Sequence, residues 1–337
     1  MNNLVQTAVS LGGRLAPIVI PNGLTSGTGL MNPSVFVTND GKILVNLRHV
    51  NYTLYHSENT QKFPSRWGPL AYLHPEQDLT LRTINYLVEL SPSFEVKNYS
   101  QIDTSKLDKP PIWEFAGEED CRLIEWDNDL YIIGVRRDTT DNGQGRMELS
   151  KLNVTDDFVV TEVSRERIPA PGDDSSYCEK NWMPILDAPF RFVKWTSPTE
   201  VVEAKVISEG AVECHQVSLQ HGVTTNVDQR GGSHVVPWGD YYIALTHEVN
   251  LFNNYLGQKD GVYRHRLAVW NREFVLVGLT PTPFSFLEAE IEFACGAAKF
   301  GEDLLVTFGF QDNAAYILQL PNELVETMIE EALSYGK

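Results

Sequence analysis

Three consecutive acids, Glu118, Glu119 and Asp120, stand at the start of an apolar stretch of the chain, with Arg122 two residues further on. In an extended strand neighbouring side chains point to opposite faces, so Asp120 and Arg122 share a face that Glu119 does not. A carboxyl group that is buried or lies beside other acids can keep its proton and act as a general acid. The pattern therefore predicts that one of these acids points inward, where it could act as a general acid. An exposed acidic turn is the alternative.

Other polar and aromatic side chains stand where short apolar stretches begin or end. Carboxylates and amides suit the hydroxyl groups of a sugar, and a ring such as Trp182 or Tyr52 suits its apolar face. Clustered Arg and Lys side chains suit phosphate or another anion. The residues that we expect to bind substrate are Arg48, Asn51, Tyr52, Glu119, Arg122, Arg137, Lys180, Asn181, Trp182, Arg230, Ser233, His234, His247, Glu248 and Asp312.

A hairpin pattern that recurs five times must position these residues. In each copy a polar or small residue opens a short apolar run, a turn of Gly, Asp, Asn or Pro follows, and a stronger apolar run ends in polar residues. The five copies are residues 32–48, 120–136, 181–194, 233–247 and 296–310. Further strand-like runs lie between them, at 82–96, 146–163, 200–219 and 263–279. The tail after Pro321 has helical periodicity instead.

Five hairpins, each with outer strands, predict an all-β fold: a five-bladed β-propeller with a short C-terminal helix. Radial repetition of four-stranded units protects their edges, and this length of chain suits it. A pair of β-sandwiches is the rival fold. We expect residues 1–337 to form a single domain, in which the openings of the inner strands meet at one mouth. The irregular, aromatic segment 59–78 is either a functional rim or a packed decoration.

The net charge of −18, from 27 basic and 45 acidic residues, indicates which partners to exclude. Such a surface repels nucleic acid and anionic membranes. No run approaches the ~18 apolar residues of a membrane span, and the N-terminus lacks the pattern of a signal peptide. Carbohydrate is the expected partner, the oligomeric state is left open, and we expect a cytoplasmic location.

The four cysteines, Cys121, Cys178, Cys214 and Cys295, form no C-x-x-C pair, and the eight histidines are scattered. This pattern favours reduced thiols over disulfides or structural zinc. We therefore expect no metal and no cofactor.

The segment from Gly117 to Arg122 resembles the Glu-Asp-Pro-Arg signature of the inverting β-mannoside phosphorylase and hydrolase family, with Cys121 in place of proline. The resemblance extends to Arg48, 179–182, 230–234 and 247–248, and it covers about residues 31–320. Trp182 and His234 depart from the expected pattern. Similar propeller domains stand alone or beside glycosyltransferases, and related mannosyltransferases share the fold.

The resemblance implies a five-bladed propeller in which Asp120 is the general acid. It also implies that Arg122, Arg48 and Lys180 contact sugar or phosphate, with inorganic phosphate as a co-substrate. The leading hypothesis is an inverting phosphorylase or hydrolase acting on a mannose-like glycoside. One alternative is a glycosyltransferase that uses a sugar phosphate or nucleotide sugar. Another is a glycan-binding propeller without catalytic activity.

Overall fold

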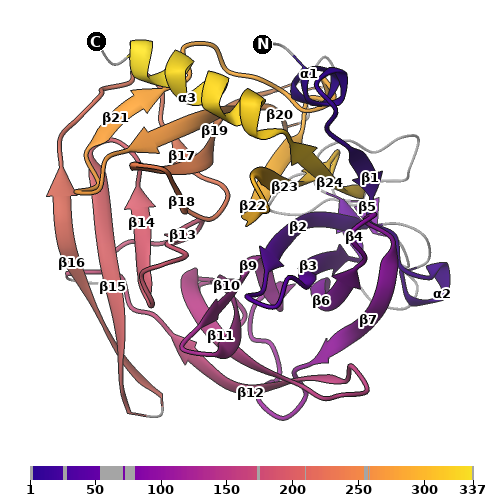
Figure 1. The fold of residues 1–337 in the computed structure, drawn as a ribbon. Coiled ribbons are helices and arrows are strands. Elements are labelled where there is room, and N and C mark those ends of the chain that lie inside the picture. The colour runs from indigo at the N-terminus through magenta and orange to yellow at the C-terminus, as the bar shows by residue number, and fades with distance from the viewer. Residues whose placement is uncertain are drawn as a thin grey trace.

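The protein is described from a computed structural model, which covers residues 3–25, 29–53, 71–72, 80–172, 175–208, 210–253, 257 and 259–335. The fold is all-β and propeller-like: sheets of mostly antiparallel strands stand around a common centre, and helices lie only at the edge (Figure 1). The predicted C-terminal helix is confirmed as α3 (Asn322–Tyr335).

A nine-stranded sheet holds the first two predicted hairpins. Its order is β2-β3-β6-β7-β12-β11-β10-β9, and β8 pairs with β6 outside this path. The strands are β2 (Leu30–Val37), β3 (Ile43–Val50), β6 (Leu81–Leu90), β7 (Val96–Asp103), β8 (Phe115–Ala116), β9 (Glu118–Trp126), β10 (Asp129–Arg136), β11 (Arg146–Val154) and β12 (Val160–Arg167). All neighbours along the path are antiparallel except β7 and β12, which are parallel and share two residue pairs.

Three further sheets hold the other hairpins. One has the order β13-β14-β15-β16, one β17-β19-β20-β21 with β18 also on β19, and one β1-β24-β23-β22. Their strands are β13 (Met183–Pro184), β14 (Arg191–Trp195), β15 (Thr199–Ser208), β16 (Ala211–Gln220), β17 (Arg230–Gly231), β18 (Val236–Trp238), β19 (Tyr241–Asn253), β20 (Lys259–Trp270), β21 (Leu276–Leu279), β22 (Glu292–Phe300), β23 (Asp303–Phe310), β24 (Ala314–Leu320) and β1 (Leu15–Pro17).

Turn residues fix the register of the hairpins. Between β9 and β10, Asp127 and Asn128 have φ of 52° and 66°, the left-handed backbone that a two-residue turn between twisted strands requires. A second turn type, which the sequence patterns did not reveal, ends in a phenylalanine with positive φ at Phe94, Phe158 and Phe274. In each, the phenylalanine N–H donates to the carbonyl three residues earlier. The same turn thus recurs between the third and fourth strands of three units.

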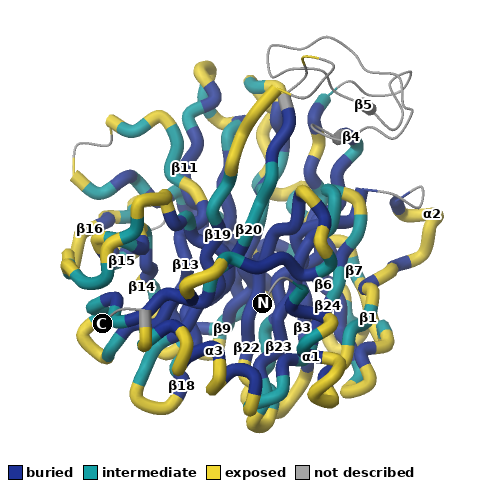
Figure 2. Tube along the Cα trace, turned by 90° about the horizontal axis from the view of Figure 1, so that it is seen from above, coloured by how far each residue is buried: buried dark blue, intermediate teal, exposed yellow. Residues whose placement is uncertain are grey.

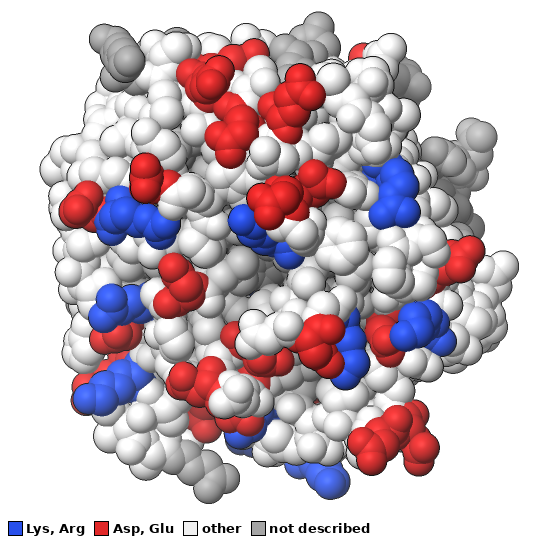
Figure 3. Space-filling model, in the orientation of Figure 1, with Lys and Arg blue, Asp and Glu red and all other residues white. Residues whose placement is uncertain are grey.

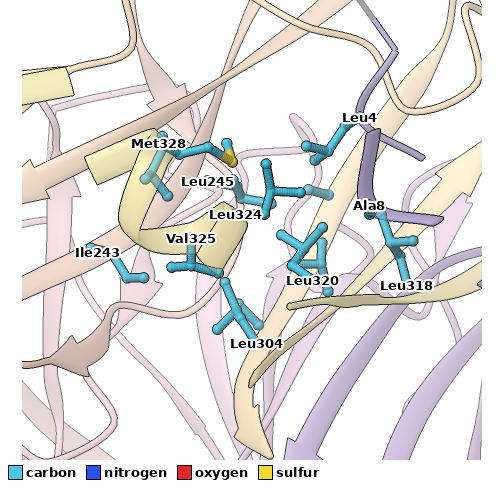
Figure 4. Close-up of a cluster of buried hydrophobic side chains, with 14 of the residues drawn as sticks. Leu4, Ala8, Ile243, Leu245, Leu304, Leu318, Leu320, Leu324, Val325 and Met328 are labelled. Atoms are coloured by element: carbon cyan, nitrogen blue, oxygen red, sulfur yellow. The ribbon is translucent and has the colours of Figure 1, made fainter. Parts of the chain in front are cut away.

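The two ends of the chain meet in one sheet, because β1 pairs with β24. The helix α1 (Leu4–Ser10) and α3 lie beside this sheet and pack into one apolar cluster (Figure 4). There Leu324 and Met328 of α3 share a buried core with Leu4 and Ala8 of α1. The sequence predictions included α3 but neither α1, β1 nor the short helix α2 (Asn22–Thr25).

One hairpin, formed by β19 and β20, has unusually long strands. β19 and β20 are 13 and 12 residues long, and they rise on the side where the short strands β4 (Tyr52–Thr53) and β5 (Ala71–Tyr72) pair (Figure 2). Of the segment 59–78, only residues 71–72 are described, so the prediction for it lies outside the described residues. Buried residues gather in the middle of Figure 2 and exposed residues at the ends of strands.

On the face seen in Figure 1, groups of acidic side chains are scattered between uncharged residues, and Lys and Arg lie beside several of them (Figure 3). Among the described residues, no helix is both long and apolar enough to cross a membrane.

Candidate functional site

A cavity of about 150 Å³ lies where the inner strands begin, and it brings together many of the predicted site residues. Asp120 lines it together with the predicted residues Arg48, Tyr52, Glu119, Lys180, Asn181, Arg230, His247 and Asp312. The lining also includes residues outside the predicted set, namely Met31, Asn32, Tyr263, Ile291 and Phe293. A larger hollow of about 930 Å³ lies between the two halves of the nine-stranded sheet and contains none of the predicted site residues.

A β-bulge aims Asp120 into the cavity. The pairing of β9 with β10 shifts between Val135, opposite Glu119, and Ile133, opposite Arg122, and Asp120 has φ of 52°. A bulge of this kind turns one side chain away from the regular alternation of the strand. Glu119 and Arg122 stand opposite Val135 and Ile133, so the bulge breaks the simple alternation on which the prediction of a shared face for Asp120 and Arg122 relied.

One oxygen of the Asp120 carboxylate is held from two sides. Nη1 of Arg48 donates to Oδ1 at 2.6 Å, and Nδ2 of Asn32 donates to the same atom at 2.7 Å. No described residue donates a hydrogen bond to Oδ2. Oδ2 is therefore the oxygen that can exchange a proton with a ligand.

The Asp120 carboxyl is ionised in this structure at neutral pH. Burial by itself would raise its pKa, but the Arg48 guanidinium and the hydrogen bond from Asn32 outweigh burial, and the charges of Arg122 and Lys180 act the same way. The pKa therefore lies below its usual value of 3.8. With these neighbours, Asp120 is a proton acceptor at neutral pH.

Arg48 is a buried cation that organises one wall. Besides Asp120, it contacts the Thr83 hydroxyl through Nε and Nη2, at 3.3 and 3.2 Å, and the Tyr52 hydroxyl through Nη2 at 3.1 Å. Glu119 lies 3.7 Å from Nη2. Burial lowers the pKa of Arg48, but these carboxylates more than reverse that effect, so Arg48 stays charged.

Two further cations have no side-chain partner in the part of the chain that the structure describes. The Lys180 and Arg230 side chains line the cavity, and neither forms an ion pair or side-chain hydrogen bond with a described residue. Lys180 is exposed and Arg230 half-buried. Their charges are therefore available to an anionic ligand.

The opposite wall is aromatic. The ring of His247 stacks on Tyr263 at 5.7 Å between centroids and meets Phe293 edge-on at 4.9 Å. Burial, and then nearby cations, hold the pKa of His247 well below 6.5, so the ring is neutral. Its Nδ1 is buried with no hydrogen-bond partner among the described residues. Tyr263 escaped prediction because it lies on β20, a third strand that reaches the mouth only because the β19–β20 hairpin is so long.

Three predicted residues, Arg122, Ser233 and His234, instead form a polar plug beneath the cavity together with Ser34 and Thr307, and we define the plug as these five residues. All five are buried, at 1 % exposure or less, and their side chains bond to backbone groups, most of them on neighbouring strands.

Arg122 directs its guanidinium at carbonyl oxygens. Nε and Nη2 donate to Gly232 O at 3.0 and 2.6 Å, and Nη1 donates to Asp120 O at 2.7 Å and more weakly to Asn181 Oδ1 at 3.3 Å. The residue therefore ties β9 to the segment before β18 and has no donor aimed at a ligand in the cavity.

His234 joins three inner strands. Its Nδ1 accepts from the Ala297 N–H at 3.2 Å, so the proton sits on Nε2, which donates to Leu123 O at 2.8 Å. Burial lowers its pKa to about 3. Ser233 likewise accepts from the Leu245 N–H at 3.0 Å. Both residues hold the fold together at its centre.

Four other predicted residues lie away from the cavity. Asn51 bonds to Thr80 O and the Arg82 N–H, and Arg137 to Gly143 O and Cys178 Sγ. Glu248 accepts from Gln229 and Arg266. Trp182 is 1 % exposed and packs on Phe192, so it cannot stack on a sugar in the cavity.

The acidic triplet thus has three environments. Glu118 is fully buried between strands, where its carboxylate accepts from the Gly134 N–H and the Ser150 hydroxyl, and burial raises its pKa to about 8. Glu119 stands at the rim and Asp120 inside. Among the described residues, no group of three or more His, Cys, Asp or Glu could hold a metal ion.

Comparison with known proteins shows what fold this site belongs to. No protein-family model and no curated protein matches the sequence. Solved structures do match. The β-1,2-mannobiose phosphorylase from Listeria innocua is 12 % identical, with 94 % of this chain and 96 % of that chain covered and a TM-score of 0.52.

Two further structures match in the same way. A glycosyl hydrolase from Bacteroides ovatus is 11 % identical, with 87 % and 84 % covered and a TM-score of 0.56. A mannose phosphorylase from Leishmania mexicana, in complex with a phosphate ion, is 11 % identical, with 96 % and 93 % covered and a TM-score of 0.50. The chain therefore has the propeller-like fold of the mannoside phosphorylases and glycoside hydrolases, as the resemblance of its motifs predicted.

Proposed function

We propose that the chain is a single domain of five blades that transfers a mannose-like glycosyl group, with inversion, to inorganic phosphate or water. The sheet order supports five blades because the nine-stranded sheet divides into two antiparallel halves. Only the two residue pairs Val160–Ile102 and Thr161–Asp103 join β12 to β7. These halves and the three other sheets make five units.

One observation carries the proposed chemistry: in a small cavity, a carboxylate whose Oδ2 accepts no hydrogen bond from a described residue lies with two cations that have no described side-chain partner. An inverting transfer needs an acid on one side of the sugar and a nucleophile on the other. Phosphate brings its own negative oxygen, so one protein carboxyl, Asp120, is enough. Lys180 and Arg230 would hold the phosphate, and Tyr263 and Phe293 would cover the apolar face of the sugar.

The protonation state of Asp120 fits a reversible phosphorylase. Bound phosphate would offset the charge of Lys180, one of the cations that lower the pKa of Asp120, and so help the carboxyl to take a proton. In the direction of glycoside synthesis, the ionised carboxylate is already the base that the acceptor hydroxyl needs.

The experiment is to incubate the protein with β-1,2-mannobiose, with and without phosphate, and to follow mannose and mannose 1-phosphate. We expect turnover that D120N lowers at least about 100-fold, whereas D129N, an acid on the opposite face, is unchanged. Full activity in D120N would remove Asp120 from the role of acid. Glycan binding without turnover on any β-mannoside, equal in wild type and D120N, would instead indicate a binding module.

A further inference from the structure

A second hollow, of about 330 Å³, adjoins the cavity. The two share three lining residues, Lys180, Asn181 and Arg230. These residues stand at the openings of β13 and β17, so the second hollow continues the first outward over the boundary between two sheets. The two hollows therefore meet at Lys180 and Arg230, neither of which has a side-chain partner among the described residues.

The second hollow has an aromatic platform, Trp195 at the end of β14. The residue is 38 % exposed and lines the hollow, and its Nε1 donates to Ser197 O at 3.1 Å, which fixes the indole. Trp182 forms the floor beneath, with its Nε1 bonded to Glu179 at 3.0 Å. An exposed indole held in this way suits a flat ring.

The acidic residues of the second hollow do not neutralise Lys180 and Arg230, which lie where the two hollows meet. The Glu179 carboxylate lies 3.9 Å from the Lys194 ammonium, which also bonds to Glu200 at 3.2 Å. Asp228 is exposed at the outer rim. Lys180 and Arg230 have no side-chain partner among the residues that the structure describes, so negative charge on a ligand would be favourable between the two hollows.

We propose that the second hollow binds a ring joined through a phosphate group to the sugar in the cavity, so that the ligand of the combined site is a glycosyl phosphate ester. The order along the ligand is a sugar near Asp120, a phosphate between Lys180 and Arg230, and a ring on Trp195. A nucleobase and a second sugar both supply such a ring. Only the sugar end of this ligand rests on the proposed function.

The first test needs no sugar: calorimetric titration with inorganic phosphate and with phenyl phosphate. We expect phenyl phosphate to bind about tenfold more tightly. W195A should remove this gain without changing the affinity for phosphate, and W195F should keep most of it. Y99A, which removes a comparably exposed aromatic from β7, is the control. Equal affinities in the wild type, or equal losses for both ligands in W195A, would overturn the proposal.

The second test identifies the ring by comparing mannose 1-phosphate with GDP-mannose. A gain for GDP-mannose that depends on Trp195 assigns the ring to a nucleobase. A gain for phenyl phosphate alone assigns it to another ring, such as a sugar. Failure of mannose 1-phosphate to bind, with the phenyl phosphate gain intact, would refute the proposed sugar site and leave the second hollow standing.

Discussion

The cavity and the polar plug beneath it both take polar residues from β2, from β9 and from the chain at and after β17, yet they differ in whether those side chains have hydrogen-bond partners. In the plug, His234 and Arg122 bond to backbone groups of neighbouring strands. In the cavity, Lys180 and Arg230 have no described partner, and Asp120 keeps one free oxygen. Polar residues at the centre of a propeller therefore have two tasks, and hydrogen-bond satisfaction separates them.

Removing a plug residue should have the largest effect on stability. We expect R122M to lower the free energy of unfolding by about 3 kcal/mol or more, because it leaves the buried carbonyls of Gly232 and Asp120 without donors. Urea denaturation measures this. A change below about 0.5 kcal/mol would mean that the plug does not stabilise the fold, and the distinction from the cavity would fail.

The plug should also make stability depend on pH. Burial lowers the pKa of His234 to about 3, below the unfolded value of about 6.5. Below pH 6.5 the unfolded chain binds a proton that the folded chain excludes, so stability falls as pH drops from 6.5 towards 3. His265, also at about 3, adds to this.

The pH dependence is tested by denaturation at several pH values, with H234Q beside the wild type. The variant should lose less stability on acidification, by about 1.4 kcal/mol per pH unit in that range. Parallel pH curves would show that His234 is not held neutral by the fold.

Substitution of a cavity residue should weaken ligand binding and leave the free energy of unfolding almost unchanged. K180M should weaken phosphate binding about tenfold and change the free energy of unfolding by less than about 0.5 kcal/mol. K205M, an exposed lysine on β15, is the matched control and should leave both unchanged. A large loss of stability in K180M would place Lys180 with the plug.

The smallest effect belongs to Arg137, a predicted binding residue whose donors reach Gly143 and Cys178 outside the cavity. We expect R137M to keep kcat/KM within about twofold, because no ligand contact is removed. A loss comparable to that of K180M would show that the ligand extends over this residue.

The hairpins could be predicted because local signals fix them. The Asp127–Asn128 turn and the alternating apolar residues of β9 and β10 set that pairing without distant contacts. The turn that ends in phenylalanine at Phe94, Phe158 and Phe274 is a further local pattern that repeats along the chain.

The division of the site between cavity and plug could not be predicted from alternation. The bulge at Asp120 shifts the register between Glu119 and Arg122, so regular alternation no longer gives the directions of their side chains. No local sequence pattern indicates this bulge. Trp182 looked like a binding ring by its position, but Phe192 on a partner strand covers it. Tyr263 reaches the cavity because the β19–β20 hairpin is long, and the length of that pairing is seen only in the folded sheet.

A crystal structure of the protein soaked with mannose and phosphate tests the cavity most directly. We expect an anion within hydrogen-bond distance of Lys180 and Arg230, and a sugar between that anion and Oδ2 of Asp120, with the plug unchanged. Phosphate bound outside the cavity, or a sugar that makes no contact with Oδ2 of Asp120, would contradict the assignment of this cavity as the site of glycosyl transfer.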